Sequence, residues 1–267
     1  MTEAALARRD VALLRADNPG PFTLDGTNTW IVGRDPCWIV DPGPALDAHV
    51  AAVLAEAARR GGAGGIALTH DHPDHVGAAA AVRAGAGGVP VAAARWEGAD
   101  VLVGDGDAVG PLRVLATPGH ATDHLAFVLG DVCFTGDAVL AESSVFVAPD
   151  PGALRGYLAA LERLRALDLA LLCTGHGPAV SDPAALLDRY LAHRRDRERR
   201  LVAALDDGLR TVDELLDRVW DDAPPSLRLA ATATLAAHLG KLDEEGLLPA
   251  GVERVAWPPA GGLRPVV

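Results

Sequence analysis

The stretch Thr69–Gly77 has the sequence THDHPDHVG and places three histidines and two aspartates within six residues. It overlaps GIALT, a short apolar run that predicts a buried strand. His70 and His72 lie two residues apart where the chain leaves this strand, and Asp74 and His75 begin the next element. The two pairs can therefore face adjacent points. Imidazole nitrogens and carboxylate oxygens are ligands of zinc and similar metals, so the stretch predicts a metal site.

Three later segments repeat one arrangement, an apolar strand followed by small residues and then a metal-binding side chain. They lead to His120 in TPGH, to Asp137 in FTGD and to His176 in CTGHG. The glycines in these segments allow the backbone to approach closely. Because strand ends held by a rigid sheet can converge on one cleft, we expect these residues to complete the site.

Short β-branched runs alternate with alanine-rich stretches over the first two-thirds of the chain, which predicts an α/β architecture. Strands are expected in NTWIVG, CWIVDPG, GIALT, VPVAAA, PLRVLAT, HLAFVLG, DVCFTG and LALLCTG. Helices are expected over residues 46–60, 75–84 and 151–166, the second of them with Asp74 as its N-cap.

The character of the chain changes after Asp182. Residues 183–205 predict a long charged helix that links a first domain, 1–205, to a second, 206–267. Two helical patterns follow, TVDELLDRVW and PPSLRLAATATLAAHLGKLDEEGLL. The tail VERVAWPPAGGLRPVV predicts two short strands around a Pro/Gly turn. This order of elements resembles a winged-helix domain.

The motifs HxHxDH, GH, GD and GHG, in that order, resemble those of the metallo-β-lactamase superfamily over roughly residues 20–182. The resemblance implies a four-layer αβ/βα sandwich with the site at one edge of its two sheets. It also implies two metal ions, expected to be Zn²⁺, with Mn²⁺ or Fe as alternatives. By this resemblance, one ion is bound by His70, His72 and His120, the second by Asp74, His75 and His176, and Asp137 bridges both.

Within the superfamily, the C-terminal winged helix and three segments are similar to the β-lactamase-like protein 2 group. The segments are TNTWIVG, TPGHATDHLAF and PDPGALRGYL. Part of that group comprises single-strand endoribonucleases, and bacterial relatives are often called hydroxyacylglutathione hydrolase-like. Antibiotic-degrading lactamases with two zincs usually have a cysteine in the second site, whereas this chain has Asp137 at the bridging position. The interval from Asp137 to His176 also has no room for a β-CASP insertion.

The composition limits the partners that the protein can have. The formal net charge of −12 counts against broad nucleic-acid binding. The acidic C-terminal part lacks the positive charge that DNA-binding domains carry. No apolar run is long enough to span a membrane and no signal peptide is visible, so a cytoplasmic location is expected. The three cysteines are interpreted as buried, reduced residues. A homodimer is suggested by the resemblance alone.

Several residues leave two interpretations open. His124 either contacts substrate or donates a proton, or is a structural or surface residue. Asp41 either orients a ligand histidine or forms the turn in WIVDPG. The arginines of residues 194–200 either follow phosphates or form a solvated helix face. Asp71 is expected to be solvated, and the remaining histidines are expected to be surface or core residues, namely His49, His193 and His238.

These observations predict a dinuclear metal hydrolase in which a metal-bridging hydroxide attacks the substrate. The residues expected to act in catalysis are Asp74, Asp137 and His124. The favoured substrate is a small ester, thioester or lactone, because the chain is acidic. Single-stranded RNA is the alternative, favoured by the subgroup resemblance and by the arginine-rich helix. An iron-containing redox enzyme is a third hypothesis, since the ligand types also suit iron.

Overall fold

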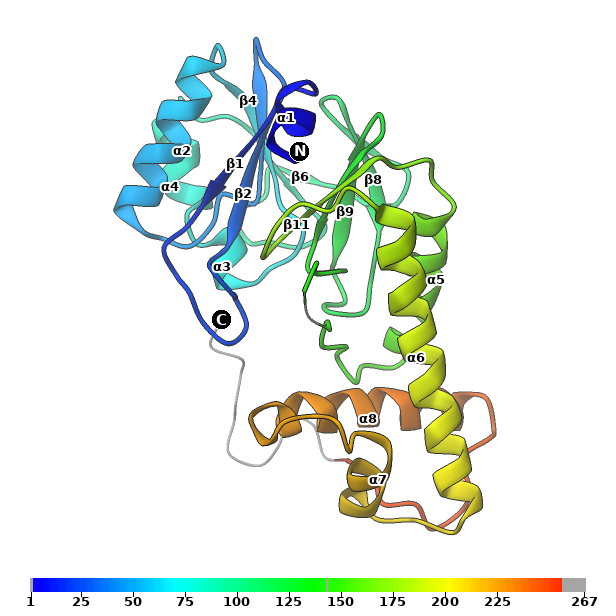
Figure 1. Ribbon diagram of the computed structural model, residues 1–267. Helices are drawn as coiled ribbons and strands as arrows, with labels where there is room; N and C mark the ends of the chain where they lie inside the picture. The colour runs from blue at the N-terminus through cyan, green and yellow to red at the C-terminus, as the bar shows by residue number, and fades with distance from the viewer. Residues whose placement is uncertain (1, 143, 256–267) are drawn as a thin grey trace.

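The computed structural model describes residues 2–142 and 144–255 and forms two parts, one above the other in Figure 1. The larger part contains two β-sheets with helices on their outer faces. The smaller part consists of helices and is joined to the larger one by the long helix α6 (Pro183–Asp206). None of the helices described is both long and apolar enough to cross a membrane.

The first sheet has the strand order β1-β2-β3-β4-β5-β6 within the described chain. Its strands are β1 (Val11–Arg15), β2 (Asn28–Val32), β3 (Cys37–Val40), β4 (Ala63–Ala67), β5 (Val91–Ala93) and β6 (Val101–Leu102). The strands β1, β2 and β3 are antiparallel neighbours, whereas β3, β4, β5 and β6 run parallel. The carboxyl ends of β3 and β4 therefore meet at one edge, where the histidine-rich stretch begins.

The second sheet has the order β11-β10-β9-β8-β7. Its strands are β7 (Ala108–Val109), β8 (Leu112–Ala116), β9 (Leu125–Leu129), β10 (Val132–Gly136) and β11 (Leu171–Thr174). Strands β10 and β11 are parallel, so the segments that follow them, with Asp137 and His176, leave the sheet at the same edge. All eight strands predicted before residue 183 are present; β1, β6 and β7 are additional.

The two sheets pack face to face through a buried apolar layer that includes Trp30 from the first sheet and Phe127 and Phe134 from the second. A second layer packs the outer face of the first sheet against α2 (Asp47–Arg59) and α4 (Ala79–Gly85). A third packs the second sheet against α5 (Ala153–Arg165) and α6. The order helix, sheet, sheet, helix confirms the predicted four-layer αβ/βα sandwich.

The helix predicted over 75–84 is wrong in detail. The chain forms two short helices there, α3 (Pro73–Val76) and α4, and the N-cap of α3 is His72 rather than Asp74. The Asp74 side chain is buried and accepts a hydrogen bond from the Thr27 hydroxyl at 2.9 Å. Its carboxylate thus faces the interior of the site instead of capping the helix.

The C-terminal module contains α7 (Val212–Val219), a short 3₁₀ turn (Pro225–Leu227) and α8 (Arg228–Glu244). Thr211 caps α7 in a capping box with Glu214. The end of α6 contributes Leu201, Ala204 and Leu205 to the apolar core of this module. Of the predicted C-terminal hairpin, residues 252–255 form no strand, and residues 256–267 lie outside the described residues.

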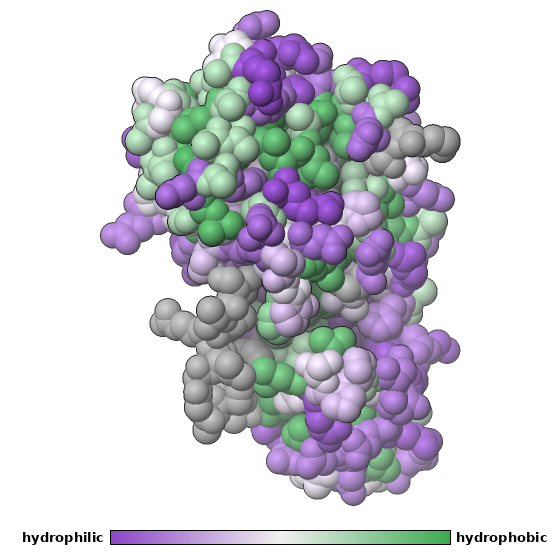
Figure 2. Space-filling model, turned by 60° about the vertical axis from the view of Figure 1, so that its left-hand side comes forward, coloured by the Kyte–Doolittle hydropathy of each residue, from purple (hydrophilic) through white to green (hydrophobic). Residues whose placement is uncertain are grey.

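The surface in Figure 2 mixes hydrophilic and hydrophobic residues over both parts of the molecule, with hydrophilic residues concentrated along one edge of the lower part. All three cysteines, Cys37, Cys133 and Cys173, are buried and unpaired, as expected. Two of the three histidines assigned to surface or core positions, His49 and His238, are buried.

Candidate metal centre

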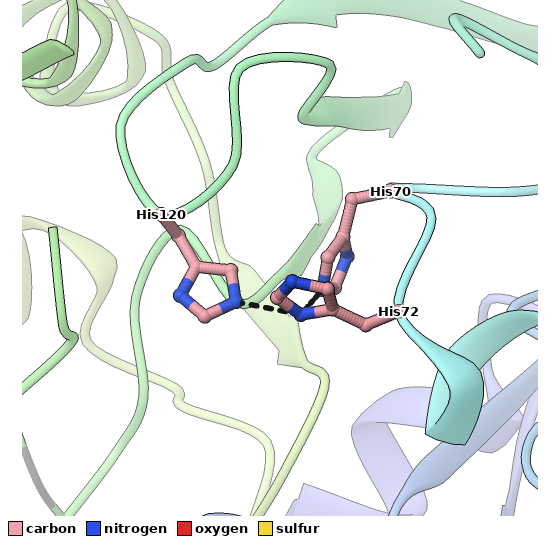
Figure 3. Close-up of side chains that lie close together, drawn as sticks. All are labelled: His70, His72 and His120. Carbon is pink, nitrogen blue, oxygen red and sulfur yellow. Dashed lines mark hydrogen bonds between the residues drawn. The ribbon is translucent and has the colours of Figure 1, made fainter. Parts of the chain in front are cut away.

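Three histidine rings from two loops face one another at the edge of the sandwich. His70 and His72 leave the end of β4, and His120 leaves the end of β8 (Figure 3). Nδ1 of His72 lies 2.9 Å from Nε2 of His70 and 3.1 Å from Nε2 of His120. Three nitrogens at this spacing can be bound by one cation.

A second group lies beside the first and is made of Asp74, His75 and His176. Oδ2 of Asp74 is 3.3 Å from Nε2 of His75 and 3.4 Å from Nε2 of His176. All three residues are buried. The group therefore offers two nitrogens and one carboxylate oxygen to one point, a second set of ligand types suited to a divalent cation.

Asp137, at the end of β10, lies between the two groups. Its Oδ2 is 3.7 Å from Nε2 of His120 and 3.4 Å from Nε2 of His176, and its Oδ1 is 3.6 Å from Nε2 of His75. Gly175 makes this approach possible, because a Cβ there would lie 2.3 Å from Oδ1 of Asp137. The structure thus brings together all seven side chains that the sequence singled out.

A chain of hydrogen bonds fixes which nitrogen the rings of His70 and His75 present to the metal centre. Oδ2 of Asp41 accepts from Nδ1 of His75 at 2.8 Å and from the Thr69 hydroxyl at 2.7 Å. That hydroxyl can then only accept from Nδ1 of His70, at 2.9 Å. Nε2 of both rings is left free for a metal, one in each group. Asp41 therefore orients two ligand histidines at once.

Backbone carbonyls have the same effect on the rings of His120 and His176. Nδ1 of His120 lies 3.3 Å from the carbonyl oxygen of Phe146, and Nδ1 of His176 lies 3.3 Å from that of Gly26. Donation from each Nδ1–H leaves Nε2 with its lone pair toward the centre. Sequence reasoning missed Thr27, Thr69 and these carbonyls, because nothing in the local pattern shows which loop they approach.

Charge at the site favours a bound cation. Burial lowers the pKa of His70 well below its ordinary value and that of His72 to about 4, so these rings are neutral. Burial also opposes charge on His75, yet the carboxylates of Asp74, Asp137 and Asp41 outweigh it and raise the pKa of His75 well above its ordinary value. The carboxylates around His75 thus favour positive charge at the centre of the second group.

Unsatisfied atoms provide the test of fit. Among the described residues, four buried polar atoms of the site have no hydrogen-bond partner: Oδ1 of Asp74, Nε2 of His75, Oδ1 of Asp137 and Nε2 of His176. Buried polar groups are normally paired, and each unpaired one costs about 1–3 kcal/mol. Coordination of divalent metal satisfies such atoms, so the donor set fits the metal that the motifs imply.

The geometry favours the structural alternative for His124. The ring is buried, its Nε2 accepts from the Asp137 backbone N–H at 3.1 Å, and its Nδ1 lies 2.8 Å from the Thr117 hydroxyl. Both nitrogens are occupied, which leaves none to transfer a proton to substrate. Asp71 is exposed, and its backbone N–H donates to Asp123.

Comparison with known proteins agrees with the fold. Residues 83–176 match the Metallo-beta-lactamase superfamily, and residues 211–250 match the Beta-lactamase associated winged helix domain. A Beta-lactamase-like protein 2 homolog from Caenorhabditis elegans is 31% identical over 256 residues, which cover 89% of this chain and 85% of that protein. The chain belongs to the metallo-β-lactamase superfamily. It is a hydrolase with a C-terminal winged-helix domain.

Two further proteins extend the comparison. An Atrochrysone carboxyl ACP thioesterase from Aspergillus chevalieri is 30% identical over 275 residues, covering 95% of this chain and 85% of that protein. The crystal structure of a metallo-beta-lactamase family protein from Thermus thermophilus superposes with a TM-score of 0.71 and 26% identity. That superposition covers 88% of this chain and 94% of the other. Most of this chain therefore shares its architecture with a superfamily member.

Proposed function

We propose that this metallo-β-lactamase-fold protein is a dinuclear metal hydrolase of small carboxylic thioesters or esters, lactones included. The observation that carries the proposal is the set of four buried, unpaired atoms on Asp74, His75, Asp137 and His176, which face one another beside the three-histidine group. Asp137 lies near His120 of one group and near His75 and His176 of the other, a position that would suit a bridging ligand.

The protein's own residues prepare the site for this chemistry. When bound, two divalent cations would supply Lewis acidity that lowers the pKa of a water toward about 7 and polarises the substrate carbonyl. Asp41 and the carbonyls of Phe146 and Gly26 keep the histidine rings oriented. The nearby rings of His176 and His75 outweigh burial and hold the pKa of Asp137 well below its ordinary range, so that its carboxylate stays ionised.

Zinc is the metal that we propose, since nitrogen and carboxylate ligands suit it. Mn²⁺ and Fe remain alternatives, because their ligand preferences overlap with those of zinc.

Charge pairing on α6 favours an acyl substrate over RNA. Arg194 is buried, and Arg197 is bound to Asp222 at 2.7 Å. The exposed arginines of the same run are paired as well: Arg195 with Glu162, Arg199 with Asp196 and Arg200 with Asp221. These cations are thus already compensated within the protein, and the net charge of −12 repels a polyanion. Similarity to a thioesterase adds support.

Single-stranded RNA is the second candidate. Similarity to proteins named Beta-lactamase-like protein 2 homolog favours it, since the group that the sequence motifs resemble includes single-strand endoribonucleases. The electrophile in that case would be a phosphorus atom rather than a carbonyl carbon. The two candidates use the same metal centre and differ only in the groups that recognise the substrate.

A substrate panel tests the proposal. Purified wild-type protein is assayed with acyl thioesters, esters, lactones and single-stranded RNA, at about 50 and 200 mM salt. We expect thioester or ester hydrolysis that depends little on salt and that is lost in Asp137→Ala. The matched control Asp206→Asn changes an exposed carboxylate at the end of α6 and should behave as wild type. RNA cleavage that falls steeply with salt, without acyl hydrolysis, would overturn the substrate assignment.

A further inference from the structure

Arg194 is a fully buried cation in the middle of α6, with 1% of its surface exposed. One Nη2–H donates to the backbone carbonyl of Val145, and the guanidinium carbon lies 5.3 Å from the centre of the Tyr157 ring. Burying a guanidinium is costly unless it is well partnered. This arginine therefore holds the segment 144–148 against α5 and α6 at a substantial expense in desolvation.

The segment that Arg194 holds also contacts a ligand of the metal centre. The next carbonyl along the chain, that of Phe146, accepts from Nδ1 of His120. The Ala148 N–H donates to the carbonyl of Gly119 at 2.9 Å, so the segment is also bound to the residue that precedes His120. Because the Phe146 carbonyl sets the orientation and tautomer of His120, any shift of the segment moves this ligand.

The helix that carries Arg194 is held in place on both sides of this residue. Toward its start, the Tyr190 hydroxyl exchanges hydrogen bonds with the backbone of Leu140, at 2.9 and 3.1 Å. Three residues beyond Arg194, Arg197 donates to the carbonyl of Val219 and to the carboxylate of Asp222 in the C-terminal module. Arg194 therefore projects from a rigid support, which is what a positioning group needs.

The geometry points to Arg194 as a positioning residue for His120, acting through the carbonyls of the segment 144–148. This inference rests on the metal binding in the proposed function and extends it to a residue outside the metal centre. Partners that orient metal ligands typically contribute about 10–100-fold to metal affinity. The contribution should fall on the three-histidine group, of which His120 is a member.

Metal affinity and hydrogen exchange of the full chain test the inference. In Arg194→Met we expect the three-histidine site to bind Zn²⁺ about 10–100-fold more weakly in a chelator competition. The affinity of the other site should be unchanged. Amide exchange of residues 144–148 should also accelerate in metal-free protein. The control Arg195→Met removes the neighbouring exposed arginine, which pairs with Glu162, and should leave both quantities at wild-type values.

A second variant decides the matter if Arg194→Met does not fold. Arg194→Lys keeps the charge but loses the planar donor group, and we expect about threefold or greater weakening at the same site. Wild-type Zn²⁺ affinity at both sites in a folded Arg194 variant would overturn the role of Arg194 but not the proposed function. Wild-type protein that binds no metal would overturn the proposed function and this inference with it.

Discussion

The carboxylate of Asp41 and the ring of His75 are joined by a hydrogen bond of 2.8 Å between Oδ2 and Nδ1. Asp41 follows β3, and His75 lies on the helix that follows the adjacent parallel strand β4. The same oxygen accepts from the Thr69 hydroxyl, which relays the constraint to His70. A single carboxylate thus orients one histidine in each of the two ligand groups.

Asp41→Asn is expected to weaken metal binding by about 10–100-fold. The amide nitrogen of asparagine cannot accept, so at least one donor among Thr69 and His75 loses its partner. Chelator competition with Zn²⁺ measures the effect, and Asp206→Asn serves as the exposed control. Equal affinities of Asp41→Asn and wild type would show that these hydrogen bonds do not orient the ligands.

Gly175→Ala is expected to disrupt the metal centre while leaving the fold intact. An added Cβ would lie 2.3 Å from Oδ1 of Asp137 and 2.8 Å from Cε1 of His75, so both side chains must move. Gly104→Ala is the matched control, because a Cβ there meets no described atom within 4 Å. Circular dichroism and metal content measure the two effects separately. Full metal content in Gly175→Ala would contradict the packing at the site.

Much of this site was predictable because each ligand follows an apolar strand and small residues, as His120, Asp137 and His176 do. Parallel strands place such ends at one sheet edge. Asp74 was predicted both as a metal ligand and as a helix N-cap, because a short helix-capping pattern and a buried ligand look alike in sequence, and the structure excludes the N-cap. The hydroxyls of Thr27 and Thr69 reach the site through contacts across the fold, of which local sequence carries no signal.

The arginine-rich helix shows a further limit of sequence reasoning. A run of five arginines within residues 194–200 suggested either a surface that contacts phosphates or a solvated helix face. The structure instead buries Arg194 and Arg197 and pairs the run with carboxylates or backbone carbonyls. Those partners of the two buried arginines lie outside α6, and the helix meets them only after folding.

Acid should weaken the attachment of α8 to α6. The His238 ring, 3.7 Å away, and the Lys241 ammonium, 2.8 Å away, lower the pKa of Glu198 to about 2 from its ordinary value of 4.5. A lowered folded-state pKa stabilises the fold above about pH 4.5, and the stabilisation is lost as the pH falls toward about 2. Glu198→Gln removes the titrating group and so removes this pH dependence.

Thermal unfolding of wild type and Glu198→Gln at about pH 7 and about pH 3 measures the difference. Wild type should have the higher unfolding midpoint at neutral pH. The difference between the midpoints of wild type and Glu198→Gln should be smaller in acid. The exposed Asp206→Asn provides the control for a lost carboxylate. A difference between the two unfolding midpoints that stays constant or increases at low pH would contradict the pairing of Glu198 with α8.

We propose that two divalent ions bind between four segments of the chain. Metal analysis of purified protein tests it most directly, by giving the number of ions bound per chain in wild type and in His176→Ala. The account predicts two ions per wild-type chain and one in the variant, because His176 belongs only to the second ligand group. An active wild-type protein with one ion or none would contradict it.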